Sequence, residues 1–299
     1  MKNLTAKQHH VPQFYLSQWQ AAGKETVHCY DLVEKKHFTQ APRNILTLRN
    51  FYEEDPANPD NRMEDHLAEM EGESAAVFRS VAAIDFSDLR KDDKRGYMQR
   101  ATKALTPEVC SAIKKFANYQ YLRVPGVIAA KRGELQASAL TPNQLDHHLN
   151  PGRFVEAGVA YTEGRFQSLR IKLCLSQSED FITSDWPCFD MHDSEMAPAI
   201  GEDIGRKPGV VCVMPLNPRM AAIFYPESFN PMTALVPNGF GMVLPPAEVR
   251  NFNVLVIQQA GRFVVTRNQS DFVFKVAAKR KKAAASWGTQ NGGAHVGNG

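Results

Sequence analysis

The sequence predicts an α+β fold in which helices fill most of the first half and strands most of the second. Apolar residues recur at helical spacing between about residues 61 and 138, whereas short β-rich runs separated by Pro, Gly and Asn follow residue 165. The strands do not alternate regularly with helices, so the pattern favours a mostly antiparallel sheet over a doubly wound parallel one. We therefore expect a single composite domain over 1–277, with an N-terminal part of about 1–150 and a β-rich part of about 165–277.

The first elements are a hairpin followed by helices. Residues 25–32 alternate as a strand does, and 35–39 follow a short charged turn as the partner strand, whereas 42–59 is predicted to be irregular. Helices are predicted where apolar residues form one stripe and a proline or a short polar side chain precedes them. These helices cover about 61–82, 107–124 and 126–138, and another begins at Thr141.

The second half is read as strands, and the chain ends in a polar tail. We expect the early hairpin to join the late strands, which favours one domain over two. Residues 278–299 are rich in Gly, Ala and Asn and have almost no large apolar side chains, so disorder is predicted there. The predicted strands are 169–175, 181–183, 210–214, 221–225, 252–258 and 263–266.

The composition is that of an ordinary globular protein. The 299 residues are 43% hydrophobic and 22% charged, and no apolar run approaches the roughly 20 residues that span a bilayer. Residues 1–20 lack the order of a signal peptide, so we expect a cytoplasmic location and no membrane partner. Five scattered cysteines without a C-x-x-C pair argue against a disulfide framework or a zinc knuckle. The formal charge of +3 becomes −1 without the four basic residues at 279–282, so the body has no overall basic field.

Several short motifs occur together in one known family. An H-x-V-P-x-x-Y-L pattern begins at His9, a Q-x-x-R-x-P pattern begins at Gln120, and F-I-T-S-D-W-P covers residues 181–187. The set resembles DUF4238, a bacterial family of unknown function, over roughly residues 8–270. His10 departs from the family, which usually carries an aromatic residue such as tyrosine there, so His9 corresponds to the motif histidine. The resemblance implies no reaction, and the chemistry is therefore argued from the residues.

Gln120 and Arg123 lie three residues apart on an otherwise apolar helix that a proline ends. Arginine keeps its charge, so Arg123 needs a carboxylate or an anionic ligand. Glu71 or Asp185 would satisfy it in a structural role, whereas a phosphate or carboxylate substrate would satisfy it in a cleft. The residues alone favour neither interpretation.

The glutamates Glu64 and Glu71 are seven residues apart, which places them on one helix face about 10.5 Å apart along the axis. That separation is too long for both to hold one small ion without further ligands, although each can point into a common cleft. Exposure to solvent or pairing with an arginine is the alternative.

The segment Thr183-Ser184-Asp185 follows a predicted strand and precedes Trp186-Pro187, a place where loops present reactive groups. Asp185 would bind a divalent cation or orient His9, and Ser184 would bind a phosphate oxygen. An Asx or Ser turn, in which the same oxygens accept backbone N–H groups, explains the segment without chemistry.

His9 is a candidate general base, general acid or metal ligand, because histidine titrates near neutral pH. Each role needs a carboxylate or a carbonyl on the second ring nitrogen. The sequence offers Glu64, Glu71 and Asp185 for that purpose. A hydrogen-bonded structural histidine is the alternative.

The leading hypothesis is a metal-assisted phosphodiester hydrolase, a nuclease for RNA or DNA in a bacterial defence or toxin-like role. It assigns catalysis to His9, Arg123 and Asp185, substrate binding to Gln120 and Ser184, and the metal, Mg²⁺ or Mn²⁺, to Glu71 and Asp185. The alternative is a non-catalytic module that binds a protein or nucleic acid, in which these residues form a buried structural network. If His9, Glu71, Arg123 and Asp185 converge at an open cleft, the enzyme is favoured. If they are buried and hydrogen-bonded to one another, the module is favoured.

Overall fold

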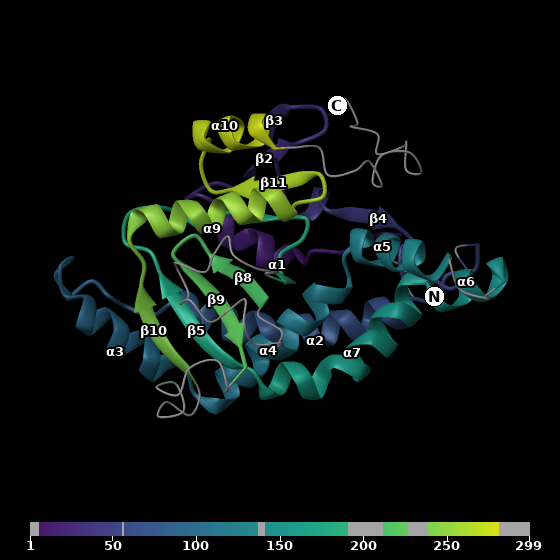
Figure 1. Ribbon diagram of the computed structural model, residues 1–299, viewed down its shortest axis with the longest axis horizontal. Helices are drawn as coiled ribbons and strands as arrows, with labels where there is room; N and C mark the ends of the chain where they lie inside the picture. The colour runs from purple at the N-terminus through teal and green to yellow at the C-terminus, as the bar shows by residue number, and fades with distance from the viewer. Residues whose placement is uncertain (1–5, 56, 137–140, 191–211, 227–238, 281–299) are drawn as a thin grey trace.

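The computed structural model describes residues 6–55, 57–136, 141–190, 212–226 and 239–280 (Figure 1). The first part of the chain combines short strands with the longer helices. Its elements are β1 (Lys7–His9), α1 (Gln13–Leu16), η1 (Ser17–Trp19), β2 (Val27–Asp31), β3 (Lys36–Gln40), η2 (Pro42–Asn44), β4 (Thr47–Arg49), α2 (Arg62–Ala82), α3 (Lys94–Ala104), α4 (Pro107–Leu122), α5 (Pro125–Gln136), α6 (Pro142–His148) and α7 (Pro151–Ser168).

The rest of the described chain supplies most of the strands. Its elements are β5 (Arg170–Leu175), β6 (Thr183–Ser184), β7 (Phe189–Asp190), β8 (Cys212–Asn217), β9 (Met220–Tyr225), β10 (Gly239–Val243), α9 (Pro246–Gln259), β11 (Phe263–Thr266) and α10 (Asp271–Lys279). None of the helices in this described part of the protein is long and apolar enough to cross a membrane.

Two larger sheets and one small one organise the fold. The five-stranded sheet has the order β10-β5-β9-β8-β7 and is antiparallel except where β10 runs parallel to β5. The four-stranded sheet has the order β3-β2-β11-β6, and β1 pairs with β4 in a separate ribbon. The predicted α+β class with mostly antiparallel strands is therefore confirmed. The pairing of β2 with β11 also confirms that the early hairpin joins the late strands.

The five-stranded sheet is buried on both faces. On β5, Ile171, Leu173 and Leu175 belong to the core that includes the apolar stripes of α2 and α4. Cys174, on the opposite face, belongs to a second core with residues of α9 such as Phe252. Figure 1 shows α9 on one side of the strands, with α2 and α4 farther from the viewer. Successive residues of β5 alternate between these cores because side chains of a strand point to opposite faces.

The predicted helices near residues 61, 107, 126 and 141 are all present. Asp60 accepts a hydrogen bond from the backbone N–H of Arg62 at 2.8 Å as α2 begins, and Thr106 accepts one from Val109 as α4 begins. A capping box formed by Thr141 opens α6. Local signals for helix starts were therefore reliable where short polar side chains satisfy the first free N–H groups.

The predicted strand over 252–258 is wrong, because these residues lie in α9. The run Phe-Asn-Val-Leu-Val-Ile-Gln is rich in β-branched residues, which suggested a strand. However, the buried residues Val249, Phe252 and Val256 recur at helical spacing, and a proline occupies the first turn. The helical spacing of the buried residues, rather than their β-branched composition, therefore agrees with the observed helix.

Several elements carried no recognised signal. Helices α3, α7 and α10 and strand β10 were not predicted. Because α10 continues to Lys279, ordered chain extends past the expected boundary at 277. The remainder of the predicted disordered tail, residues 281–299, lies outside the described residues.

Gly241 provides a test of the packing between α3 and β10. A Cβ atom at this position would lie 2.5 Å from the Cβ of Ala101 and 2.9 Å from the carbonyl oxygen of Met98. We expect Gly241→Ala to lower the free energy of unfolding by about 1–3 kcal/mol, because helix and strand must separate. Gly72→Ala, where nothing lies within 4 Å, should instead raise it by about 0.5–1 kcal/mol. Urea unfolding measures both, and equal effects would contradict the packing argument.

Candidate functional site

Arg123 is the centre of a buried polar cluster at the end of α4. Its side chain is 1% exposed. Its Nη1 donates to Glu71 Oε1 at 2.6 Å, its Nε donates to the Tyr52 hydroxyl at 3.0 Å, and its Nη2 donates to the carbonyl oxygen of His9 at 2.5 Å. Three separate segments therefore supply acceptors to one guanidinium. Burial alone would lower the pKa of Arg123, but Tyr52 and Glu71 raise it, so the group stays charged.

His9 is half-buried and takes part through its backbone as well as its ring. The ring Nε2 lies 3.3 Å from the carbonyl oxygen of Pro42, and the His9 carbonyl accepts hydrogen bonds from Arg123 and from the hydroxyl of Tyr52. Burial lowers the pKa of His9, while Pro42 and Glu71 oppose that shift. The ring is therefore neutral at pH 7, and its carbonyl carries the structural contact.

Three side chains around Arg123 hold buried polar atoms without a hydrogen-bond partner among the described residues. These atoms are Nδ1 of His10, Oε2 of Glu64, and both Oε1 and Nε2 of Gln120. Burial raises the pKa of Glu64 to about 7, and burial followed by repulsion from Arg123 lowers the pKa of His10 to about 3. His10 and Gln120 are thus neutral at neutral pH, whereas Glu64 is about half protonated. They can bind water or a neutral hydrogen-bonding molecule, whereas the charge of Arg123 is already compensated.

Asp185 lies in a different network from Arg123. Its Oδ1 accepts from the backbone N–H of Gly261 at 2.8 Å, and its Oδ2 accepts from those of Arg262 and Phe263 at 2.6 and 3.1 Å. Burial raises the pKa of Asp185, and these three N–H groups oppose the rise. The carboxylate therefore holds the turn that leads into β11.

Ser184 forms a local turn beside it. Its Oγ donates to the carbonyl oxygen of Trp186 at 3.0 Å and accepts from the Trp186 N–H at 3.1 Å. Asp185 and Ser184 thus use their polar atoms as the turn interpretation requires. No hydrogen bond or ion pair within the described ranges joins either residue to Arg123 or Glu71.

The structure brings four of the predicted site residues together and leaves two apart. His9, Glu71 and Arg123 share hydrogen bonds, and Gln120 lies one helical turn from Arg123. The predicted metal ligands Glu71 and Asp185 do not share an ion site, because one is bonded to Arg123 and the other to backbone N–H groups. Across the part of the chain that the structure describes, no group of three His, Cys, Asp or Glu side chains could hold a metal ion.

Tyr52 was not predicted to be a member of the cluster. Its hydroxyl donates to the carbonyl oxygen of His9 and accepts from Nε of Arg123, so it links the two residues. Gln8 and Glu53 on either side of these residues form a second buried link, with Gln8 Nε2 donating to Glu53 Oε1 at 2.6 Å. In the sequence, Gln8 directly precedes His9 and Glu53 directly follows Tyr52. These polar neighbours were a local signal of the second link.

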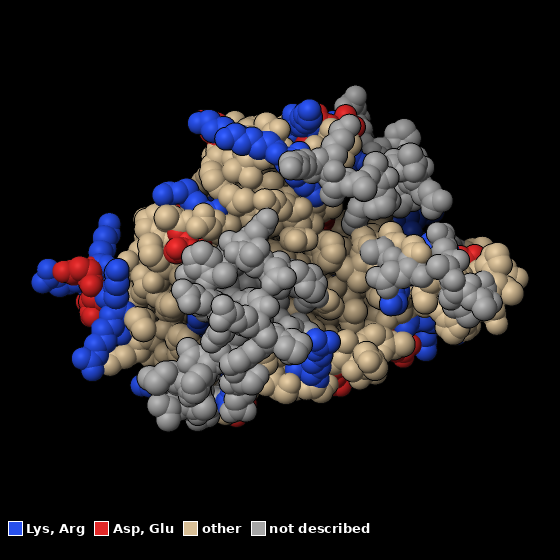
Figure 2. All heavy atoms as spheres, viewed as in Figure 1, with Lys and Arg blue, Asp and Glu red and all other residues tan. Residues whose placement is uncertain are grey.

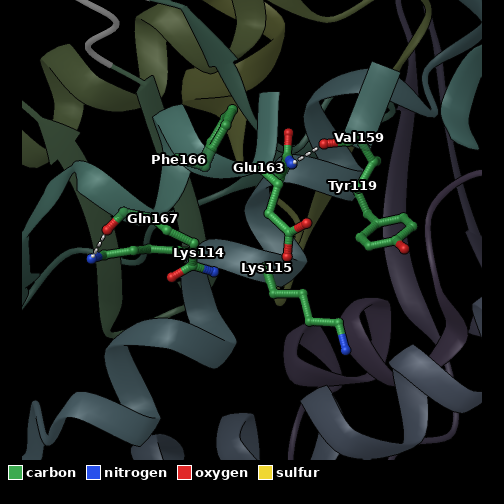
Figure 3. A pocket seen from close by; sticks show the side chains of 8 residues that line it. Lys114, Lys115, Tyr119, Val159, Glu163, Phe166 and Gln167 are labelled. Atoms are coloured by element: carbon green, nitrogen blue, oxygen red, sulfur yellow. Dashed lines mark hydrogen bonds between the residues drawn. The ribbon is translucent and has the colours of Figure 1, made fainter. Parts of the chain in front are cut away.

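A small cavity lies between α4 and α7 and is poorly suited to a substrate (Figure 3). Its volume is about 50 Å³, well below the roughly 300 Å³ at which ligand pockets begin. Lys114 donates to the carbonyl oxygen of Gln167 at 2.9 Å, and Lys115 pairs with Glu73 at 2.8 Å. Both ammonium groups already have acceptors, and only Lys115 is paired with a carboxylate, so it is the small volume of the cavity that makes it unsuited to a substrate.

Glu64→Gln tests whether this carboxyl titrates in the folded protein. The folded pKa of about 7 exceeds the ordinary 4.5, so the folded state holds a proton that the unfolded state has lost. The contribution of Glu64 to stability therefore falls as pH rises from about 4.5 to about 7. We expect Glu64→Gln to gain about 1–2 kcal/mol over the native protein across that window. Urea unfolding at several pH values measures the gain, with the exposed Glu69→Gln as control; a pH-independent difference would contradict the assignment.

His10→Phe should stabilise the protein, most strongly in acid. Phenylalanine keeps the edge contact with Phe51, whose ring centre lies 6.4 Å away, and removes the unpaired Nδ1, worth about 1–2 kcal/mol. The folded pKa of about 3 lies below the ordinary 6.5, so the His10 contribution is lost as pH falls through that range. Denaturation at pH 7.5 and 5.0 should show the larger gain at pH 5.0. Equal gains at both pH values would mean that His10 does not titrate as described.

Comparison with known protein families gives a match that covers most of the chain. The family model described as "Protein of unknown function (DUF4238)" matches residues 7–162 and 159–270 of this chain. Neither the curated proteins nor the solved structures include a match to it. The matched ranges include both the Arg123 cluster and the Asp185 turn. The chain therefore belongs to the DUF4238 family.

Proposed function

We propose that this chain is a non-catalytic module that binds a protein partner and whose motif residues stabilise the fold. The proposal is carried by Arg123 and Asp185, two buried ionisable groups whose hydrogen bonds are all made within the protein. Arg123 donates to three acceptors inside the protein, and the Asp185 carboxylate accepts three backbone N–H groups. Neither group is available to a substrate without breaking buried hydrogen bonds.

Metal-assisted phosphodiester hydrolysis has weaker support from this geometry. That chemistry needs carboxylate oxygens free to bind Mg²⁺ or Mn²⁺ and a cation facing the phosphate. Glu71 is bonded to Arg123, and Asp185 holds the turn at residues 261–263. Turning Arg123 toward a phosphate would break an ion pair whose guanidinium is buried and whose carboxylate is only partly exposed, which destabilises the fold.

The surface charges favour a protein partner over nucleic acid. Binding to a phosphate backbone depends on cations that are free to neutralise it. Several described surface arginines are instead paired with nearby carboxylates. Figure 2 shows Lys and Arg side chains spread over several parts of the drawn face, with Asp and Glu among them at its left edge. The pairs include Arg62–Glu156, Arg90–Asp92, Arg100–Asp88, Arg132–Asp146, Arg153–Glu54 and Arg250–Glu179.

A reducing compartment suits this module. All five cysteines are buried and none forms a disulfide, and burial raises the pKa of Cys29 and Cys174 to about 12. Such thiols are inert and resist oxidation. We therefore propose that the protein works in the cytoplasm, where thiols stay reduced.

The decisive experiment combines an activity assay with a stability measurement. The purified protein is incubated with labelled RNA, single-stranded DNA and duplex DNA in Mg²⁺, Mn²⁺ or EDTA, and its melting temperature is compared with that of Asp185→Asn. We expect no cleavage and no stable complex at physiological salt. Asp185→Asn should lower the melting temperature by several degrees, because it loses charge-assisted bonds worth about 1.5–3 kcal/mol.

The control is Asp92→Asn, which removes an exposed carboxylate paired with Arg90. It should leave the melting temperature within about one degree of the native value, since surface ion pairs contribute little. Cleavage that requires the metal and disappears in Asp185→Asn, with an unchanged melting temperature, would overturn the proposal in favour of a nuclease.

A further inference from the structure

Two histidines of the β2–β3 hairpin share one hydrogen bond. His28 Nδ1 lies 2.9 Å from His37 Nε2, and the ring centres are 5.0 Å apart with planes inclined by 12°. The two rings are therefore nearly parallel, and one nitrogen of each ring faces the other at hydrogen-bonding distance. Only one hydrogen fits between them, so one nitrogen must present its lone pair and that ring must be neutral.

Helix α10 rests on the same side of this hairpin. The ring of Phe274 meets Tyr30 edge-on, with centres 4.6 Å apart, and lies 6.5 Å from His37. The backbone N–H of Ser270 donates to the Tyr30 hydroxyl at 2.6 Å just before the helix begins. The hairpin surface beneath α10 thus consists of the Tyr30 and His37 rings, whose centres are 5.0 Å apart.

The other end of α10 is fixed to α9. Arg280 Nη2 donates to the carbonyl oxygens of Gln258 and Ala260, which end α9, and Val273 is fully buried. Figure 1 shows α10 above α9 and beside β2 and β3. Of these two attachments, the one on the hairpin includes imidazole side chains.

We propose that the His28–His37 pair is a proton-sensitive latch for α10. While one ring is neutral, the hydrogen bond holds both rings in place and α10 packs on them. When both rings are protonated, two N–H groups point at each other and two positive charges lie side by side. The rings then separate to reach water, and α10 loses the aromatic surface on which Phe274 packs.

The surrounding groups set the direction of the pH dependence. Burial, followed by the charge of His28, lowers the pKa of His37. On α10, Asp271 is the charged group that acts on Tyr30; on β11, the residue opposite His28 is the uncharged Thr266. Because the folded pKa of His37 is lowered, its contribution to docking is complete above the ordinary value of 6.5 and is lost as pH falls.

Hydrogen exchange of the α10 amides tests the latch in the full chain. After correction for the intrinsic effect of pH, native α10 should exchange about tenfold faster at pH 5.0 than at pH 7.5. His37→Phe keeps an aromatic ring beside Tyr30 and Phe274 but cannot gain a proton, so its α10 should show the same protection at both pH values. His147→Phe is the matched control. His147 also neighbours a histidine, but its Nε2 bonds to Arg153 rather than to that neighbour, so its α10 should behave as in the native protein.

Two results would overturn the latch: α10 protection in the native protein that does not change with pH, or the same pH dependence in His37→Phe. If His37→Phe does not fold, nuclear magnetic resonance titration of the native imidazoles replaces it. The amide signals of α10 must then shift together with the titration of the His28 and His37 rings. Ring titration without that shift would equally refute the proposal.

Discussion

The buried guanidinium of Arg123 is the constraint on which the first half of this structure depends. Its charge cannot be removed, so folding must bring acceptors to it from Glu71 on α2, from Tyr52 in the loop before α2, and from the carbonyl of His9. The N-terminal segment is therefore tied to the α2–α4 helix pair by one side chain. Loss of a partner from such a cluster is far more costly than the net stabilisation of the intact ion pair, because the remaining charge stays buried.

Asp185 applies the same principle to the second half with the opposite charge. Its carboxylate gathers the N–H groups of residues 261–263 and fixes the turn that starts β11. The strand that follows completes the four-stranded sheet by pairing with both β2 and β6. Under the proposed function, the family motifs around Arg123 and Asp185 serve to satisfy these buried groups.

Two side chains near Arg123 have buried polar atoms without a hydrogen-bond partner among the described residues, and their pKa values are shifted. Glu64 and His10 both lie near Arg123, and burial shifts their pKa values in opposite directions, toward about 7 and about 3. Their effects on stability therefore oppose each other in weakly acidic solution. The His28–His37 pair lies where α10 meets the four-stranded sheet. Because α10 contributes Val273 to the core shared with α9, its release would uncover part of that core.

The sequence by itself determined the fold class, the early hairpin and the helices α2, α4, α5 and α6, because helix periodicity, helix caps and strand alternation are local properties of the chain. It also identified His9, Glu71, Gln120, Arg123 and Asp185 as residues that need an explanation. Tertiary structure decided what each of them does. The N–H groups that donate to Asp185 lie more than 70 residues away in the chain, and Tyr52 reaches Arg123 across a similar separation, so no local pattern contains these pairings. Residues 252–258, expected to form a strand, lie in helix α9. The face of α9 that is buried is set by its packing against the five-stranded sheet, which is also a long-range contact.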